Sequence, residues 1–279
     1  MKYSVGLPTG RACGDPEFLV ELAVLAEASG WDGVLLEDYV VFQGDPAAPT
    51  CDTFAVLAAI AVKTESIRLG TTVTPLTRRR PWVVARQAAT VDQLSHGRMI
   101  LGVGLGDTGE SVGRDASFTH FGEERDARRR AEMLDEALAI VAGLWSDEPF
   151  SFRGRHFELQ EVTFLPRCVQ RPRIPIWIGG GYPNRGPTER ALRWDGACLY
   201  HREGRPLGGD DVRDLRARAG ERAFDILAGG WGRLKDPDAE RERIRAVADA
   251  GATWWGEYIG AADRRAMRRA VGRGPLRVD

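Results

Sequence analysis

The chain has 279 residues, 43% of them hydrophobic, and its 39 Lys and Arg nearly balance 40 Asp and Glu for a formal net charge of -1. This length is enough for one large domain with a substantial core. The near-neutral charge gives no electrostatic reason to expect nucleic acid or an anionic membrane as a partner.

The chain shows no signs of export or membrane insertion. Its first residues lack the basic and apolar regions of a signal peptide, and no apolar run approaches the roughly 18 residues that span a bilayer. Its four cysteines lie far apart, without a CxxC pair. They are typical of reduced thiols, so we expect a cytoplasmic protein without a disulfide framework or a zinc site.

Short apolar runs alternate with longer amphipathic segments, the pattern of a parallel α/β protein. Eight such runs match the number of strands in a (β/α)8 barrel, which typically takes about 250 residues. We therefore predict an α/β fold, a (β/α)8 TIM barrel, as a single domain over residues 1–279. The expected strands are Tyr3–Pro8, Gly33–Glu37, Ile67–Val73, Arg98–Val103, Pro175–Gly179, Gly196–Tyr200, Phe224–Ala228 and Thr253–Ile259.

Capping residues mark the ends of the intervening helices. Asp15 and Asp236 each precede a proline, and Gly30 and Gly251 are placed to end the same two helices in a left-handed conformation. Residues 124–145 carry apolar side chains at spacings of three and four, which indicates a helix with one buried face.

One segment departs from this rhythm. Residues 150–169 alternate between apolar and polar side chains around Gly154, as a β-hairpin does. The segment lies between the fourth and fifth expected strands. We therefore predict an insertion over about residues 146–172, with a β-hairpin before strand five.

Barrel enzymes build their sites from the loops at the C-terminal ends of the strands, and two of these loops are rich in glycine. The loop after the fourth strand contains a GxGxxG match at Gly104, Gly106 and Gly109. A dinucleotide fingerprint would need a helix to follow at once, whereas the next expected helix starts near residue 124. We interpret these glycines as positions where a flat ring lies against the backbone, because a Cβ would hold it off.

The second loop, residues 178–188, reads Ile-Gly-Gly-Gly-Tyr-Pro-Asn-Arg-Gly-Pro-Thr and precedes a helix expected at Glu189–Trp194. Glycine amides, an arginine and a helix N-terminus together favour an anion. Gly180 and Gly181, after Gly179, would approach a phosphate, with Arg185 as its charge partner. The alternative interpretation is a tight turn without a ligand.

Several motifs resemble the luciferase-like monooxygenase family in order and spacing, over roughly residues 3–200. The last 80 residues match by architecture only. The resemblance rests on Ile67–Gly70 with Thr-Thr-Val after it, Arg86-Gln-Ala-Ala-Thr-Val-Asp-Gln-Leu-Ser-His-Gly-Arg98, Leu101-Gly-Val-Gly-Leu-Gly106, Phe121-Gly-Glu, Asp135-Glu-Ala-Leu, Leu144-Trp145, Phe152-Arg-Gly154, Pro175-Ile-Trp-Ile-Gly-Gly180 and Arg190-Ala-Leu-Arg-Trp-Asp-Gly196.

This resemblance implies a barrel that binds FMN or F420 at its C-terminal mouth, commonly as a homodimer. By position, the peptide between Thr72 and Val73 would lie against the flavin ring and would be a non-proline cis bond. Gly180 and Gly181 would take the phosphate. The ring would be lined by Asp38, Thr74, Gly104, Gly106 and Glu110.

One departure from the family concerns the proton donor. Many members carry a histidine after the aspartate that ends strand two, and this chain has Tyr39 there. A tyrosine donates a hydrogen bond but rarely acts as a base near neutral pH. His201, after strand six, is the alternative proton handler, and Glu110 is a third candidate. Each also has an ordinary interpretation as a side chain that only lines the mouth.

We therefore expect an oxidoreductase that acts on a small organic substrate and uses no metal, nucleic acid or membrane. With reduced FMN and O2 it would be a monooxygenase supplied by a flavin reductase, and with F420 it would transfer a hydride. The sequence slightly favours FMN over F420. The alternatives are a non-catalytic flavin-binding protein or accessory subunit, and a barrel that binds an unrelated phosphorylated metabolite.

Overall fold

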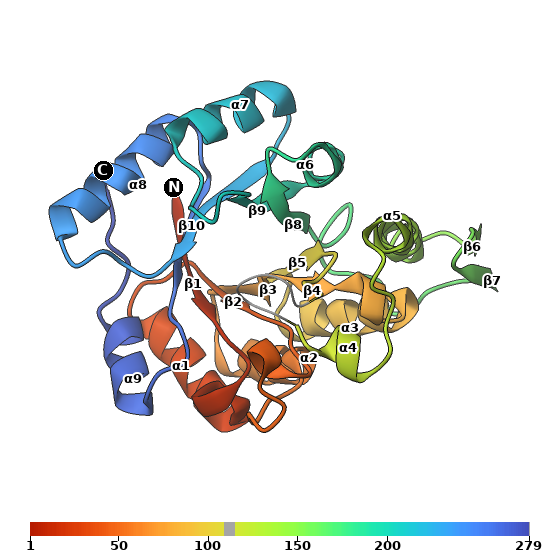
Figure 1. The fold of residues 1–279 in the computed structure, drawn as a ribbon. Helices are drawn as coiled ribbons and strands as arrows, with labels where there is room; N and C mark the ends of the chain where they lie inside the picture. Colours follow the sequence, from red (N-terminus) through yellow and green to blue (C-terminus); the bar gives the residue numbers. More distant parts are fainter. Residues whose placement is uncertain (109–114, 279) are drawn as a thin grey trace.

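The computed structural model describes residues 1–108 and 115–278. Eight parallel strands close into a barrel surrounded by helices (Figure 1), and pairing of β3 with β5 completes the closure. The predicted TIM barrel and all eight expected strands are therefore confirmed. The strands are β1 (Lys2–Leu7), β2 (Gly33–Leu36), β3 (Arg68–Thr71), β5 (Met99–Gly104), β8 (Ile176–Tyr182), β9 (Gly196–His201), β10 (Asp225–Trp231) and β11 (Trp254–Tyr258); the short β4 (Thr74–Pro75) pairs with β5.

The helices begin at the predicted caps. Asp15 accepts hydrogen bonds from the backbone of residues 17 and 18, and Asp236 from residues 238 and 239. Gly30 and Gly251 have positive φ angles of 81° and 100°. The helices are α1 (Pro16–Ala28), α2 (Thr53–Lys63), α3 (Pro81–Leu94), α4 (Ser117–His120), α5 (Ala127–Leu144), α6 (Arg185–Ala191), α7 (Gly209–Ala219), α8 (Pro237–Asp249) and α9 (Arg264–Gly272), with 3₁₀ turns η1 (Arg11–Gly14), η2 (Phe42–Gly44) and η3 (Leu76–Arg78).

Two helices differ from the prediction. The helix expected at residues 124–145 is α5, which begins at Ala127 after the Asp126 N-cap, and the short α4 precedes it. The helix expected at Glu189–Trp194 is α6, which begins earlier, at Arg185, and ends at Ala191. The reason is Pro187, whose fixed φ angle suits the first turn of a helix, so the helix starts before the proline instead of after it.

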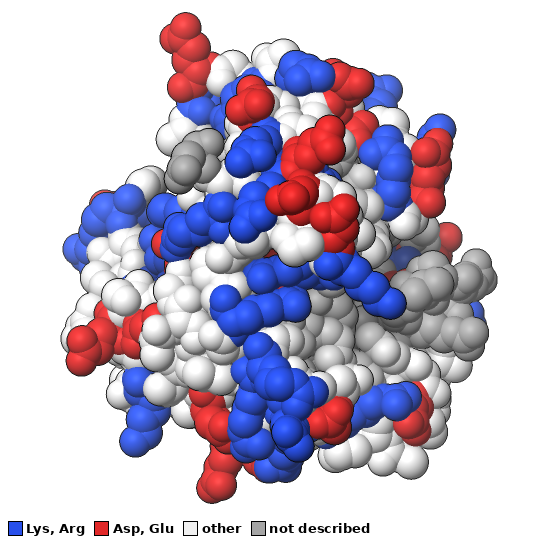
Figure 2. Space-filling model, turned by 90° about the vertical axis from the view of Figure 1, so that its left-hand side faces the viewer, with Lys and Arg blue, Asp and Glu red and all other residues white. Residues whose placement is uncertain are grey.

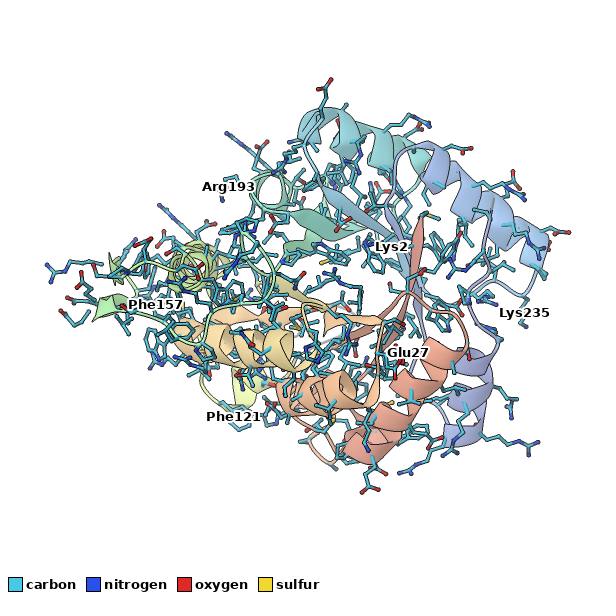
Figure 3. All side chains as sticks on the ribbon, turned by 180° about the vertical axis from the view of Figure 1, so that it is seen from behind. Lys2, Glu27, Phe121, Phe157, Arg193 and Lys235 are labelled. Carbon is cyan, nitrogen blue, oxygen red and sulfur yellow. The ribbon has the colours of Figure 1, made fainter. Side chains whose placement is uncertain are left out.

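The predicted hairpin is present before β8. It consists of β6 (Phe150–Arg153) and β7 (Glu158–Val162), paired antiparallel, and Figure 1 shows it beside α5 at the edge of the molecule. The Phe150 ring packs on Gly143 of α5, where a Cβ would lie only 2.1 Å from it. Phe157, labelled in Figure 3, places its ring 6.2 Å from that of Trp82, so aromatic contacts attach the hairpin to the barrel's helices.

The barrel interior is filled at the end where the strands begin. The rings of Trp177 and Trp254 lie 5.5 Å apart at 68°. Lys2, labelled in Figure 3, places its Nζ 5.3 Å from the Trp254 ring. Leu35, Ile100 and Leu227 complete this inner cluster. A ligand site therefore belongs at the opposite end, the mouth, where the strands finish.

The outer surface is unevenly charged. Figure 2 shows Lys and Arg gathered on the face that carries α8 and α9. Several of these arginines are paired with carboxylates, which fastens the C-terminal segment to α1 and the strands beside it. The pairs include Arg264 with Asp15 (2.5 Å), Arg268 with Glu21 (2.5 Å), Arg277 with Asp32 (3.2 Å), and Arg273 with Glu257. None of the helices that the structure describes has the length and apolar character to cross a membrane.

Candidate functional site

The turn between β3 and β4 contains a non-proline cis peptide bond between Thr72 and Val73, as expected. The Val73 side chain lies over two glycines of neighbouring strands. A Cβ on Gly104 would come within 2.9 Å of Val73 Cγ2, and one on Gly179 within 2.6 Å of Cγ1. These glycines therefore make room for Val73. They have a packing reason to be glycine, and the contact of Gly104 with a flat ring stays a prediction.

Gly106 also has a structural reason to be glycine, and its contact with a ring likewise stays a prediction. Its φ is +77°, which favours glycine, and a Cβ there would lie 2.6 Å from the Phe118 ring and 2.9 Å from Pro75. Arg130 donates hydrogen bonds to the carbonyl oxygens of Leu105 and Gly106. Residues 105–108 after β5 are not helical, which does not fit a dinucleotide fingerprint. Gly109 and Glu110 lie outside the described residues.

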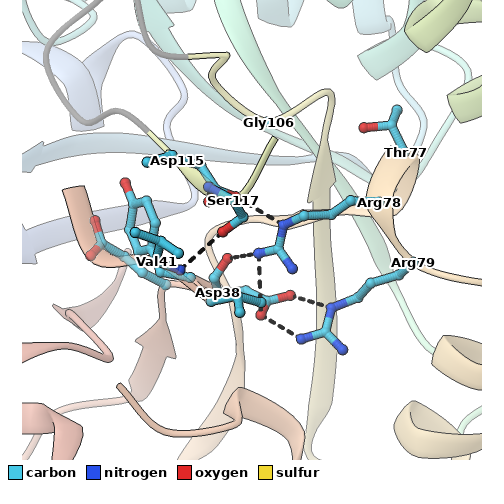
Figure 4. Close-up of polar contacts among 12 residues, drawn as sticks. Asp38, Val41, Thr77, Arg78, Arg79, Gly106, Asp115 and Ser117 are labelled. Atoms are coloured by element: carbon cyan, nitrogen blue, oxygen red, sulfur yellow. Dashed lines mark hydrogen bonds and ion pairs between the residues drawn. The ribbon is translucent and has the colours of Figure 1, made fainter. Parts of the chain in front are cut away.

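Asp38, directly after the end of β2, forms a buried network with two arginines (Figure 4). Arg79 binds its carboxylate through two hydrogen bonds, Nε to Oδ2 at 2.8 Å and Nη2 to Oδ1 at 2.6 Å. Arg78 donates to the Asp38 carbonyl oxygen and, through Nε, to Asp115 Oδ2 at 2.9 Å. Only 1% of the Asp38 side chain is exposed. In this structure Asp38 fastens the loops of the mouth together, and its contact with a cofactor ring stays a prediction.

Tyr39 is half-buried, and its ring meets Phe42 edge-on at 5.4 Å. Burial, and then the nearby carboxyl groups of Glu37 and Asp115, raise the pKa of the Tyr39 phenol far above its ordinary value. A phenol that keeps its proton can donate a hydrogen bond but cannot act as a base. The structure thus agrees with the limited role that the residue type suggests.

His201 is not brought together with Asp38 and Tyr39. It pairs in register with Tyr182, whose ring lies 6.2 Å away and whose hydroxyl donates to Asp214 of α7 at 2.8 Å. Both side chains are therefore on the α7 side of their strands, and alternation turns the neighbouring Tyr200 toward the barrel axis. This orientation does not favour His201 as a proton donor to a ligand in the mouth.

The glycines expected in a loop after the fifth strand belong to the strand itself, because β8 continues to Tyr182 and pairs with β9 through Gly180 and Gly181, so the loop begins only at Pro183. Gly180 has φ +150°, and a Cβ there would lie 2.6 Å from Pro187. A Cβ on Gly181 would lie 3.1 Å from Asn184 Nδ2 and 3.7 Å from Arg202 Cβ. Because α6 has only seven residues, its dipole contributes little. The case for an anion here therefore rests on nearby cations.

Two arginines beside this loop have no ion-pair partner in the part of the chain that the structure describes. Arg185 and Arg202 are both exposed. Sequence reasoning named Arg185 and missed Arg202. The sequence contains a partial signal for Arg202. This residue directly follows β9, and β9 neighbours β8 in the barrel. Neighbouring parallel strands bring their C-terminal loops side by side.

Sequence reasoning also missed Glu37. Leu35 belongs to the inner cluster, so alternation along the chain turns Glu37, two residues later, toward the barrel axis. Its Oε2 is buried with no hydrogen-bond partner among the described residues, and the Tyr258 hydroxyl bonds to the carboxyl group. Burial raises the pKa of Glu37 to about 8, and the hydrogen bond from Tyr258 opposes that rise.

Thr74 gives a second unpartnered polar atom at the mouth. Its side chain is fully buried, and its Oγ1 has no hydrogen-bond partner among the described residues. Buried polar atoms are nearly always satisfied, so such an atom at a predicted site suits a ligand with hydrogen-bonding groups, such as a flavin-type ring. The described residues contain no group of three His, Cys, Asp or Glu side chains placed to hold a metal ion.

Comparisons with known proteins agree with this architecture. A family profile described as luciferase-like monooxygenase matches residues 2–230. The F420-dependent glucose-6-phosphate dehydrogenase of Kineococcus radiotolerans is 37% identical over 183 residues, 64% of this chain and 50% of the relative. The same enzyme from Microbacterium testaceum is 32% identical over 169 residues, 60% and 48% of the two chains. The chain spans about half the length of the curated relatives it matches.

Solved structures share the fold at lower identity. An F420-dependent secondary alcohol dehydrogenase in complex with an F420-acetone adduct superposes with a TM-score of 0.77 and 18% identity over 100% of both chains. The monooxygenase RslO1 from Streptomyces bottropensis gives 0.73 and 21% over 97% of this chain and 96% of the other. With the profile match over most of the sequence, these findings show that the chain belongs to the luciferase-like monooxygenase family.

Proposed function

We propose that this protein is an F420-dependent oxidoreductase that acts on a small organic substrate at the C-terminal mouth of the barrel. The sequence alone slightly favours FMN, but the curated relatives named above are F420-dependent dehydrogenases, and they shift the proposal to F420. FMN with O2 remains the second candidate because RslO1, a monooxygenase, shares the fold.

The observation that carries the proposal is the distribution of unsatisfied groups around the mouth. On one side, Arg185 and Arg202 have no ion-pair partner in the described part of the chain and lie beside the end of β8, where a phosphate would be bound. On another side, Thr74 Oγ1 is buried without a partner among the described residues, beside the Thr72–Val73 turn. A ligand with a polar ring and a phosphate-bearing tail would satisfy both sets of groups.

The residues would divide the work as follows. When bound, F420 supplies hydride chemistry and needs no O2. Gly180, Gly181 and the two arginines would hold the phosphate, while Thr74 would orient the ring and Tyr39 would donate a hydrogen bond. The barrel mouth would exclude water around the reacting atoms. Glucose 6-phosphate, named in the relatives, is the first substrate to test.

Three further expectations belong to this proposal. The protein would form a homodimer and reside in the cytoplasm. A flavin reductase would be required only by the FMN route.

Anaerobic turnover tests the proposal. Purified protein with F420 would be mixed with glucose 6-phosphate and with secondary alcohols, and the loss of F420 absorbance followed. Arg202→Ala should raise the KM for F420 roughly 10-fold through loss of a charge-assisted contact. Arg213→Ala, which removes an exposed ion pair on α7, should leave the KM for F420 unchanged. O2-dependent turnover with reduced FMN, and none with F420, would overturn the proposal. Tight binding without any turnover would favour the non-catalytic alternative.

A further inference from the structure

Glu37 lies at the mouth of the barrel, and one of its carboxyl oxygens is buried without a hydrogen-bond partner among the described residues. It follows β2, and its backbone is held in place because its N–H donates to the Leu7 carbonyl oxygen at 3.0 Å. Thr53 Oγ1 donates to its carbonyl oxygen at 2.8 Å. With the backbone fixed on both sides, the side chain is directed into the barrel mouth.

The Glu37 carboxyl group is only half satisfied. Tyr258, at the end of β11, also points toward the axis, because it lies four residues beyond Trp254 of the inner cluster. Its hydroxyl bonds to Glu37, whereas Oε2 stays buried with no partner among the described residues. A buried carboxyl oxygen without a partner is costly unless the group stays protonated or a ligand completes it.

Three titratable side chains among the described residues interact with Glu37, and burial favours the neutral form of each. They are the phenols of Tyr39 and Tyr258 and the thiol of Cys13 in η1. Burial raises the pKa of all three above its ordinary value, to about 12 for Cys13. In the described part of the chain, no arginine or lysine forms an ion pair with Glu37. Burial beside these neutral groups of the described chain favours the protonated form of the Glu37 carboxyl group at neutral pH.

We propose that Glu37 is the proton donor of this site and that Tyr258 positions its carboxyl group. This inference rests on the proposed function. In the step, the substrate would give a hydride from carbon to F420 and release its hydroxyl proton to solvent. The Glu37 O–H bond would break, its bonding pair would stay on the carboxylate, and the proton would pass to the F420 ring and balance the charge of the added hydride. Solvent then returns a proton to Glu37. Glu37 would thus supply the proton that the strongly held phenol proton of Tyr39 and the orientation of His201 do not favour.

The first test observes the carboxyl group itself. Protein labelled with ¹³C at glutamate Cδ would be titrated by NMR between about pH 5 and pH 10. Wild type should show one glutamate resonance with a midpoint near 8, absent from Glu37→Gln. Tyr258→Phe should move this midpoint upward, because the hydrogen bond from Tyr258 lowers the pKa of Glu37. Glu161→Gln, on the exposed hairpin, should retain it. A wild-type spectrum in which every glutamate titrates below pH 6 would overturn the proposal.

The second test links Glu37 to the cofactor. The affinity of wild type for F420, measured by fluorescence, should change slope near pH 8, and Glu37→Gln should lose this break while still binding F420. Its turnover should fall roughly 100-fold or more, while Glu161→Gln retains the wild-type rate and pH profile. An unchanged rate and pH profile in Glu37→Gln would overturn the inference. Failure of wild type to bind F420 would overturn the proposed function and this inference with it. The NMR titration would show in that case that the carboxyl group itself behaves as described.

Discussion

Arg79 binds both carboxylate oxygens of Asp38, with its Nε 2.8 Å from Oδ2 and its Nη2 2.6 Å from Oδ1. Asp38 follows β2 and Arg79 follows η3, so this pair connects two loops of the barrel mouth (Figure 4). The Asp38 side chain is 1% exposed and that of Arg79 is 16% exposed. The bond is therefore largely removed from water, unlike the exposed ion pairs elsewhere on the surface.

Breaking the ion pair between Asp38 and Arg79 should lower the stability of the protein. Arg79→Ala leaves Asp38 as a buried carboxylate whose one remaining ion-pair partner among the described residues is Arg78, so we expect the free energy of unfolding to fall by about 3 kcal/mol. Urea denaturation of wild type and variant measures the difference. Arg213→Ala, which removes an exposed pair with Asp210, should cost no more than about 0.5 kcal/mol. Equal effects of the two substitutions would contradict the account of the mouth.

Gly179 should not tolerate a side chain while Val73 is present. The Cβ of Gly179→Ala would lie 2.6 Å from Val73 Cγ1, and we expect a loss of about 2 kcal/mol from overpacking. Adding Val73→Ala removes the clashing atom and should recover part of that loss. Gly272→Ala in α9 meets only Leu25 at 3.8 Å and serves as the control. A double variant less stable than Gly179→Ala would show that Val73 is not the obstacle.

Thr74 should separate folding from ligand binding. Its Oγ1 is buried without a partner among the described residues, so Thr74→Val should leave the free energy of unfolding unchanged or raise it by up to about 1 kcal/mol. The same substitution should weaken F420 binding roughly 10-fold if the hydroxyl meets the ring. Thr77→Val is the matched control. Thr77 Oγ1 donates to the Leu105 carbonyl oxygen at 2.8 Å, so this substitution should lower the free energy of unfolding by about 1 kcal/mol. If Thr74→Val is less stable than wild type but binds F420 normally, the Thr74 hydroxyl serves folding and not ligand binding, which would contradict the prediction.

Glu37 should make stability depend on pH. Its pKa is about 8 in the folded protein against 4.5 in the unfolded chain. From about pH 4.5 upward the unfolded chain releases this proton while the folded protein keeps it, so the free energy of unfolding falls until the pH passes about 8. The fall between pH 5 and pH 8 should be about 2 kcal/mol after allowing for partial solvent access. Thermal melts between pH 5 and pH 8 should show the Tm of Glu37→Gln rising relative to that of wild type. A constant difference between the two Tm values over this range would contradict the burial of Glu37.

The architecture follows from sequence patterns that are local. Asp15 and Asp236 before prolines, and Gly30 and Gly251 at the helix ends, act within one turn, so they could be assigned without knowing the fold. The apolar runs located the strands for the same reason. The predicted start of α6 was too late because a proline can either lie in the first turn of a helix or stand before it, and Pro187 lies in the first turn.

The site was less predictable because it depends on which face of each strand is inside. Parallel barrel strands are apolar on both faces, so the sequence does not reveal that Glu37 points to the axis. For His201, β9 ends one residue later than the expected strand, and alternation then turns it toward α7. Arg202 and Val73 depend on contacts between neighbouring strands, which lie outside any local pattern.

Equilibrium binding of F420 and FMN to the purified protein, with Gly180→Asp as the control variant, tests the central claim most directly. We predict that F420 binds selectively and that Gly180→Asp abolishes binding. The added carboxylate would repel a phosphate, and a side chain at φ +150° with Pro187 at 2.6 Å does not fit. Circular dichroism would verify that the variant is folded. Preference for FMN, binding of neither cofactor, or equal binding by Gly180→Asp would contradict the account.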